Sequence, residues 1–193
     1  PPERFQTVKW HDGTNLSVAD FIMSWIMAFD RGKPDSPLYD GAAYRPEISL
    51  TSFKGIMIES YDPLVVTLYD DNFHTDAELI ASYSYLSWPQ YGFGEAPWES
   101  IAIGNTADAN YELAWSAGKA EITQVDWTSF IGGPSLEILS KNLDEALANK
   151  TIPYEPTMSQ FLTADEAAAR YQALKAWYGA HGHFWDGTGP YYL

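Results

Sequence analysis

The amino-acid sequence predicts an α+β fold, in which helices pack on a small antiparallel β-sheet. Residues 17–31, 134–147 and 163–179 carry apolar side chains at three- and four-residue spacing, which is typical of amphipathic helices. Residues 48–69 hold short apolar and β-branched runs separated by turn residues, which indicates an antiparallel meander. The length of 193 residues is typical of one domain, so we expect residues 1–193 to form a single unit.

The helix expected at residues 17–31 has the clearest start and stop signals. Ser17 stands three residues before Asp20, which is the spacing of a capping box and puts a carboxylate at the positive end of the helix. Gly32 is suited to end the helix, because glycine accepts the left-handed conformation of a C-terminal cap. The apolar face of this helix comprises Val18, Phe21, Ile22, Trp25, Ile26 and Phe29.

The segments on either side of this helix have different patterns. Residues 5–10 alternate weakly between polar and apolar side chains, which predicts a short strand. A tight turn follows at Asp12-Gly13, where glycine takes a positive φ without a Cβ clash. Residues 33–47 are rich in proline, aspartate and glycine, so we expect a loop there.

The middle of the chain is less regular. Residues 73–86 fit either a helix or a strand, since a capping-box spacing near their start competes with β-branched and aromatic residues later. A helical region is expected to begin at Trp98, to break at Gly104, to resume at Ala107 and to end at Gly118.

The last third of the chain predicts two helices joined by an extended linker. Pro134 suits the start of the first helix, whose leucines recur at helical spacing. Residues 151–162 contain two prolines and predict the linker. Thr163 and Glu166 have the spacing of a capping box at the start of the second helix, which we expect to end at Gly179.

The composition argues against several classes of function. The net charge is −15 and the isoelectric point is near 4.4, whereas nucleic-acid-binding proteins and polybasic membrane-surface segments are basic. The sequence has no cysteine, which excludes a disulfide framework and a thiolate site. It also has no apolar run of about 18 residues, the length that a transmembrane helix requires. We therefore expect no nucleic-acid partner and no cofactor.

Two motifs at opposite ends of the chain carry a family resemblance. Residues 9–29 read KWHDGTNLSVADFIMSWIMAF, and residues 182–193 read GHFWDGTGPYYL. In this order they resemble the family 5 extracellular solute-binding proteins of ABC importers, which include oligopeptide- and dipeptide-binding receptors and oligosaccharide-binding relatives. The Asp62-Pro63 turn and the apolar run after it have the position of that family's DP-x-VVTL hairpin.

The resemblance implies a fold like that of the type II periplasmic binding proteins, of which this chain would be an internal fragment. Receptors of this family are longer, so the chain would comprise the inserted domain and the edges of one ligand-binding lobe. The resemblance further implies an extracytoplasmic location, periplasmic or anchored at the cell surface, and an ABC permease in the membrane as partner. The expected ligand is a peptide. The alternatives are an oligosaccharide-binding receptor of the same family and a free-standing carbohydrate-binding module, although a module leaves the end motifs unexplained.

Aromatic residues in loop-like stretches are the candidates for contact with the ligand. These candidates are Tyr39, Tyr44, Trp88, Tyr91 and Trp98. They stand near prolines and glycines, and aromatic faces stack on sugars and on apolar side chains. The alternative is that they form a satellite core that packs one loop under another. In the family, the loop after the first helix approaches the ligand, so the resemblance favours Tyr39 and Tyr44.

Neither a metal site nor a catalytic site is expected. His181 and His183, with Asp186 nearby, have the look of metal ligands, but neighbouring glycines predict a loop and no third ligand is evident. The acidic residues that follow Tyr69 fail the EF-hand pattern, because His74 stands where an oxygen ligand is required. The sequence also has no G-x-S-x-G nucleophile elbow, and its many acidic residues do not single out a catalytic pair. We therefore expect that the protein is not an enzyme.

Overall fold

The computed structural model describes residues 7–41, 52–61, 64–71, 73–82, 90–91, 94–191 and 193, and of residues 80–82, 90–91 and 94 it describes the backbone alone. Helices and short strands alternate along the chain, and the longest sheet is an antiparallel pair, so the fold is α+β as predicted. The elements are α2 (Val18–Asp30), β1 (Phe53–Tyr61), β2 (Leu64–Asp70), α4 (Ala77–Ser82), β3 (Gln90–Tyr91), β4 (Gly94–Glu95), α5 (Trp98–Ala109), β5 (Leu113–Ala114), α6 (Ala117–Thr123), β6 (Asp126–Trp127), α7 (Ser135–Asn149), α8 (Glu155–Met158) and α9 (Ala164–His181).

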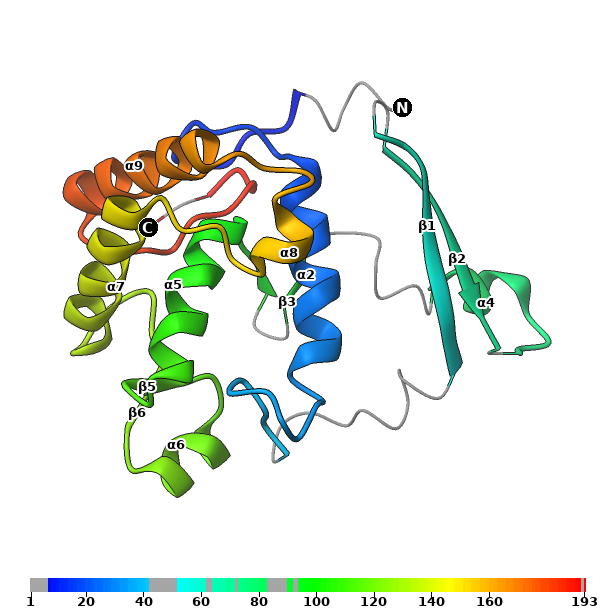
Figure 1. Ribbon diagram of the computed structural model, residues 1–193, viewed down its shortest axis with the longest axis horizontal. Helices are drawn as coiled ribbons and strands as arrows, with labels where there is room; N and C mark the ends of the chain where they lie inside the picture. Colours follow the sequence, from blue (N-terminus) through cyan, green and yellow to red (C-terminus); the bar gives the residue numbers. More distant parts are fainter. Residues whose placement is uncertain are drawn as a thin grey trace.

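The long helices and the β1–β2 hairpin occupy different sides of the molecule, and the short helix α4 lies beside the hairpin. Helices α5, α7 and α9 gather on one side of α2, and the β1–β2 hairpin lies on the other side (Figure 1). The shared core comprises buried side chains of all four helices, among them Trp25, Trp98, Leu143 and Tyr171. No helix in the described ranges is both long enough and apolar enough to cross a membrane.

Helix α2 begins as its sequence predicts. Ser17 is the N-cap, and the capping box with Asp20 is present, since the Asp20 Oδ2 accepts hydrogen bonds from the Ser17 backbone N–H (2.7 Å) and the Ser17 hydroxyl (2.9 Å). The helix ends at Asp30, close to the predicted end. Its apolar face enters the core, where Phe21 and Trp25 lie with ring centroids 6.3 Å apart. The amphipathic pattern therefore identified only part of the buried face, since Phe21, Ile22 and Trp25 are buried and Val18, Ile26 and Phe29 are half-buried. The fully buried residues that it missed are Ala19, Met23 and Met27.

An antiparallel meander was predicted over residues 48–69, and the structure contains an antiparallel hairpin in this part of the chain. Strand β1 pairs with β2 from Phe53 opposite Asp70 to Tyr61 opposite Leu64. The strand continues through Gly55, and the pairing shifts register between Phe53 and Gly55. The part of the predicted meander before residue 52 lies outside the described residues. Ring contacts attach the hairpin to the helical part, since Phe53 lies 4.6 Å from Phe29 of α2 between ring centroids.

Helix α5 is continuous, which corrects the predicted break at Gly104. A Cβ at this position would lie 2.5 Å from the indole ring of Trp115, so the glycine allows the indole to pack directly on the helix. The helix ends at Ala109 instead of continuing to Gly118, which lies inside the separate helix α6. Glycine marked a close approach between two elements here, and not a helix end.

The last two long helices occur where they were expected, with two corrections. Helix α7 starts directly after Pro134, and Leu139 and Leu143 are buried. The predicted extended linker contains the one-turn helix α8. Helix α9 starts with the predicted capping box but passes through Gly179 and ends at His181, with Gly182 as a left-handed cap at φ 73°. An isolated glycine within a helix costs about 1 kcal/mol, which tertiary packing can offset.

The remaining uncertain segments are partly described. The N-terminal strand expected at residues 5–10 is not present over the described residues 7–10, where Thr7 is helical and Lys9 forms an isolated antiparallel bridge with Asn15. Residues 5 and 6 lie outside the described ranges. Of the two alternatives for residues 73–86, the helix is present as α4 over Ala77–Ser82. The short pairs β3–β4 and β5–β6 were not predicted, because strands of two residues have no readable pattern.

Candidate functional site

The two segments that carry the end motifs lie against each other. The His11 backbone N–H donates to the Asp186 Oδ1 (2.8 Å) and to the Gly187 carbonyl (2.9 Å). The His11 ring adds two contacts, because its Nδ1 accepts from the Gly187 N–H (3.3 Å) and its Nε2 donates to the Gly189 carbonyl (2.7 Å). We call this contact, between residues 8–16 and 183–189, the end junction.

The first half of the end junction is shaped by local hydrogen bonds. The Asp12 Oδ1 accepts from the backbone N–H (2.8 Å) and the hydroxyl (2.7 Å) of Thr14, which is a turn that aspartate favours. Gly13 has φ 91°, which is the left-handed region where glycine is preferred. The Trp10 N–H donates to the Thr14 carbonyl (2.9 Å) and closes the turn. The HDGT motif therefore fixes the backbone that His11 uses to hold the C-terminal segment.

A buried ionic cluster contacts the end junction. The Arg170 guanidinium of α9 pairs with Glu99 of α5 through Nε (2.7 Å) and Nη2 (2.8 Å), and Nη2 also contacts the Asp20 Oδ1 (3.0 Å). Its Nη1 donates to the Asn15 carbonyl (2.9 Å). Asp20 and Glu99 have no exposed surface, and Arg170 is 9% exposed. Because the geometry is bidentate and the lone pairs are used, this pairing is of the strong type.

Asp20 joins three elements through one carboxylate. Its Oδ2 closes the capping box of α2, and its Oδ1 accepts from the Trp98 backbone N–H (3.0 Å) at the first residue of α5. The same Oδ1 contacts Arg170 of α9. Asp20, which the sequence identified as the capping-box partner of Ser17, is therefore also the point where α2, α5 and α9 are joined.

The end junction and the ionic cluster contain more carboxyl groups than cations among the contacts that the structure describes. Burial raises the pKa of Glu99 to about 7, an effect that Arg170 opposes and the Asp20 charge reinforces. Burial and the nearby Asp12 and Glu99 charges raise the pKa of Asp186 to about 8. Burial alone would lower the pKa of Arg170, but the two carboxylates that contact it raise it, so it stays charged. Arg170 therefore stays charged, and burial holds the pKa values of Glu99 and Asp186 above the usual range of a carboxyl group.

The histidines near the C-terminus pack on aromatic rings. The His181 ring stacks on Trp177 with centroids 3.8 Å apart, and His183 meets the same indole edge-on at 5.8 Å. The His183 Nδ1 accepts from the Trp185 N–H (3.2 Å). His181 lies in the last turn of α9, not in the predicted loop. In the part of the chain that the structure describes, no three His, Cys, Asp or Glu side chains are grouped so as to hold a metal ion.

The structure separates the five aromatic ligand candidates. Tyr39 is 40% exposed, in a loop anchored by the buried Arg31–Asp40 pair, whereas Tyr44 and Trp88 lie outside the described residues. Tyr91 belongs to β3, of which only the backbone is described. Of the five, Tyr39 is the candidate whose side chain is described and accessible.

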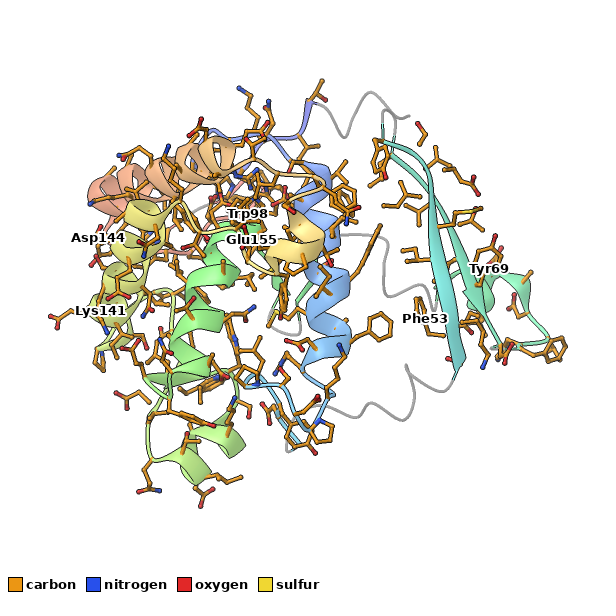
Figure 2. All side chains as sticks on the ribbon, in the orientation of Figure 1. Phe53, Tyr69, Trp98, Lys141, Asp144 and Glu155 are labelled. Carbon is orange, nitrogen blue, oxygen red and sulfur yellow. The ribbon has the colours of Figure 1, made fainter. Side chains whose placement is uncertain are left out.

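Trp98 corrects the expectation of a ligand-proximal side chain. It has no exposed surface and starts α5 in the interior of the helical part (Figure 2). Its ring meets Tyr171 edge-on with centroids 5.2 Å apart, and the Arg170 guanidinium carbon lies 5.8 Å from the ring centroid. As the first residue of a helix whose N-terminus is held by Asp20, this indole is directed into the core.

Sequence reasoning missed Glu99 and Arg170. Arg170 stands three residues after Ala167 and four before Leu174, both of which are buried, so a charged residue interrupts the apolar face of α9. Charged residues are almost never fully buried unless they are paired. This interruption was the available signal, although it does not identify the partner.

A scan against protein-family models finds no match for the chain, and a search of curated proteins finds none either.

Proposed function

We propose that this chain is part of an extracytoplasmic solute-binding protein of an ABC importer, of the family 5 type. The proposal rests on the resemblance of residues 9–29 and 182–193 to that family. The observation that carries it is the end junction, in which the two motif-bearing segments bind each other through the four His11 contacts.

The end junction supports the proposal for a geometric reason. A domain inserted into a host lobe must leave and rejoin that lobe at neighbouring points, since the host chain is otherwise pulled apart. Here His11 and Asp186 are 175 positions apart in sequence, yet they share a hydrogen bond of 2.8 Å. The residues that resemble the family's lobe-edge motifs are therefore adjacent in space, as an inserted domain requires.

In the proposed receptor, a solute is captured between two lobes that close on a hinge, and the closed form is delivered to a membrane permease. A peptide is the proposed ligand, and an oligosaccharide is the alternative. The chain contributes a domain whose helices are locked by the Asp20–Glu99–Arg170 cluster. Tyr39, in the loop after the first helix, is the exposed aromatic residue that we propose approaches the ligand.

The test is calorimetry with mixed oligopeptides and with cello- and manno-oligosaccharides, on the protein encoded by the whole reading frame and on this chain alone. The whole protein is expected to bind peptides with a Kd at or below the micromolar range. The chain alone is expected to bind at about 1 mM or more weakly, because one aromatic contact cannot enclose a ligand or offset the entropy of association.

Two outcomes would decide against the proposal. If the whole protein binds neither peptides nor oligosaccharides, the receptor function is wrong. If the chain alone binds an oligosaccharide with a micromolar Kd that Tyr39→Ala abolishes, a free-standing carbohydrate-binding module is the better description. The matched control is Tyr69→Ala, which removes an exposed tyrosine from the hairpin on the other side of the molecule.

A further inference from the structure

Both ring nitrogens of His11 contact backbone groups of the C-terminal segment, and these contacts fix the protonation state of the ring. Nδ1 lies 3.3 Å from the Gly187 backbone nitrogen, which can only donate, so Nδ1 is an unprotonated acceptor. Nε2 lies 2.7 Å from the Gly189 carbonyl oxygen, which can only accept, so Nε2 carries the proton. The end junction therefore requires a neutral imidazole whose one proton is on Nε2.

A second proton on the His11 ring is incompatible with the contact to Gly187. A charged imidazole has an N–H on both nitrogens, so Nδ1 becomes a donor that faces the Gly187 N–H. The hydrogen bond is then replaced by two donors that repel each other, and a donor that loses its acceptor is costly. Protonation of His11 therefore acts against the end junction at Gly187.

The His11 ring and the C-terminal segment are in close contact, so a movement of one displaces the other. A Cβ at Gly187 would lie 3.6 Å from the His11 Cε1, which is van der Waals distance. The His11 backbone N–H also holds this segment, through the Asp186 Oδ1 (2.8 Å) and the Gly187 carbonyl (2.9 Å). Both segments run beside α9 (Figure 1), whose Trp177 ring lies 6.0 Å from the His11 ring between centroids.

Solvent reaches this ring while the chain is folded. His11 is half-buried, and its contact with Gly189 lies at the surface. Histidine is the side chain whose ordinary change of charge falls between pH 5 and pH 8. A moderate fall in pH can therefore act on the end junction before ordinary carboxyl groups are protonated.

The titratable and charged groups around the ring come from several elements. They are Lys9 and Asp12 of its own segment, Glu95 of β4, Glu99 of α5, Arg170 and His181 of α9, and His183 and Asp186 of the C-terminal segment. Asp186 is bonded directly to His11, but burial, reinforced by the Asp12 and Glu99 charges, raises its pKa to about 8, so it is neutral below that pH. A charged His11 ring therefore gains no carboxylate partner from Asp186.

Glu99, whose pKa burial raises to about 7, changes stability with pH in the opposite direction. Because its folded-state pKa lies above the ordinary value, the folded state binds more protons and stability increases as the pH falls. An end junction that loosens as the pH falls is therefore not an effect of Glu99. His181 and His183 both contact the Trp177 ring, so a proton on either adds positive charge near His11 and acts in the same direction as the His11 proton.

We propose that the end junction is an acid-released latch, in which the neutral His11 ring holds residues 187–189 and a second proton on that ring releases them. The latch lies within this chain, so it does not rest on the receptor function proposed above. It is closed at neutral pH and opens as the pH falls toward 5. In a longer protein that contains this chain, the segments at its two ends are then held together at neutral pH and free to move apart in acid.

The first measurement is the protonation state of the His11 ring in the ¹⁵N-labelled chain at pH 7, from the ring nitrogen signals of a long-range ¹H–¹⁵N spectrum. We expect a neutral ring with its proton on Nε2, as the contacts with Gly187 and Gly189 require. Any other predominant state overturns the proposal.

The second measurement is the backbone order of the C-terminal segment at pH 7 and pH 5. ¹⁵N relaxation of the Gly187 and Gly189 amides is expected to give order parameters of about 0.85 at pH 7, which is typical of a rigid backbone, and below about 0.6 at pH 5. The Leu143 amide, in the middle of α7, is the internal reference and is expected to keep its order parameter. Equal order parameters of the two glycines at both pH values overturn the proposal, as does a fall that Leu143 shares, since the whole chain then loosens.

Replacement of single histidines identifies the ring that responds. His11→Gln removes the titrating group and keeps a side chain that both donates and accepts, so the two pH values are expected to give the same order parameters. His74→Gln is the matched control, because His74 is exposed and precedes α4 beside the hairpin, and this variant is expected to keep the full pH response. A pH response that persists in His11→Gln overturns the proposal.

His181→Gln and His183→Gln test the two histidines that contact Trp177. Each variant is expected to keep the pH response, and loss of the response in either one overturns the proposal. If the amide spectrum of His11→Gln shows an unfolded chain, the parent chain decides the outcome. The pH midpoint of the fall in order is then expected to coincide with the midpoint of the His11 ring signals, and a midpoint that follows the ring signals of His181 or His183 instead overturns the proposal.

Discussion

Replacement of Arg170 by methionine would leave the Glu99 carboxyl buried without its guanidinium partner. Asp20 would keep its bonds to Ser17 and to the Trp98 N–H, so Glu99 would lose the most. Removal of one member of a buried ion pair typically costs about 3–5 kcal/mol. We therefore expect Arg170→Met to lower the free energy of unfolding by about that amount at pH 8.

The loss should depend on pH in a direction that the Glu99 pKa determines. In the parent chain the folded-state pKa of Glu99 is about 7, above its ordinary value of 4.5. Between these values the folded state binds more protons than the unfolded state, so stability falls as the pH rises, by up to about 3 kcal/mol from this carboxyl. Without Arg170 the pKa of Glu99 rises further, so the variant is penalised less at pH 5, where Glu99 is protonated, than at pH 8.

Urea unfolding of four chains at pH 5 and pH 8 would measure these effects. The chains are the parent, Arg170→Met, Glu99→Gln and the double variant, which form a double-mutant cycle. The double variant is expected to recover most of the pH 8 loss, because Glu99 is then replaced by a neutral amide and Asp20 keeps its hydrogen bonds to Ser17 and to the Trp98 N–H. An Arg170→Met loss that is equal at both pH values, or a double variant that loses as much as the sum of the singles, would refute this reasoning.

Three further predictions concern charge, core packing and backbone. Asp186→Asn should raise the free energy of unfolding at pH 9 but hardly change it at pH 5. Because the folded-state pKa of Asp186 is raised to about 8, the stability that its protonated form contributes is lost as the pH rises through 8. Equal stability of variant and parent at pH 9 would contradict this. Trp25→Ala should cost about 3–5 kcal/mol, since the ring is 6% exposed in the core; a melting temperature within two degrees of the parent would show otherwise. Gly104→Ala should destabilise the chain by about 1–3 kcal/mol, because the added Cβ would lie 2.5 Å from Trp115. Gly179→Ala has open space around it and should stabilise the chain by about 0.5–1 kcal/mol. Thermal melts in which both variants shift the melting temperature in the same direction would refute this distinction.

Features that depend on neighbours in sequence were predictable from the sequence. The capping boxes at Ser17 and Thr163 are present, because their residues stand three apart and need no other element. The antiparallel pairing of residues 53–61 with 64–70 follows from two strand patterns around one turn. The α+β class and the positions of the long helices follow from these local signals.

The glycines show where local signals fail. Gly104 and Gly179 were expected to break or end helices, and both lie inside helices instead. At Gly104 the reason is a residue eleven positions away, Trp115, which packs where a side chain would be. Sequence identifies a glycine as permissive, but only packing decides whether that freedom serves a turn or a close contact.

The sequence by itself determined the two end motifs and the capping box of Ser17 and Asp20, whereas only the tertiary structure decided which distant residues they contact. The His11–Asp186 bond spans 175 residues, and the Arg170–Glu99 pair spans 71. A cap needs one partner within a single turn, but a buried charge needs a partner whose position depends on the packing of several helices. The same holds for Trp98, whose loop-like sequence surroundings suggested an exposed side chain. In the structure it begins α5, where its N–H contacts Asp20 and its ring packs against Tyr171 in the core. Burial of the ring there is favourable because it removes a large apolar area from water.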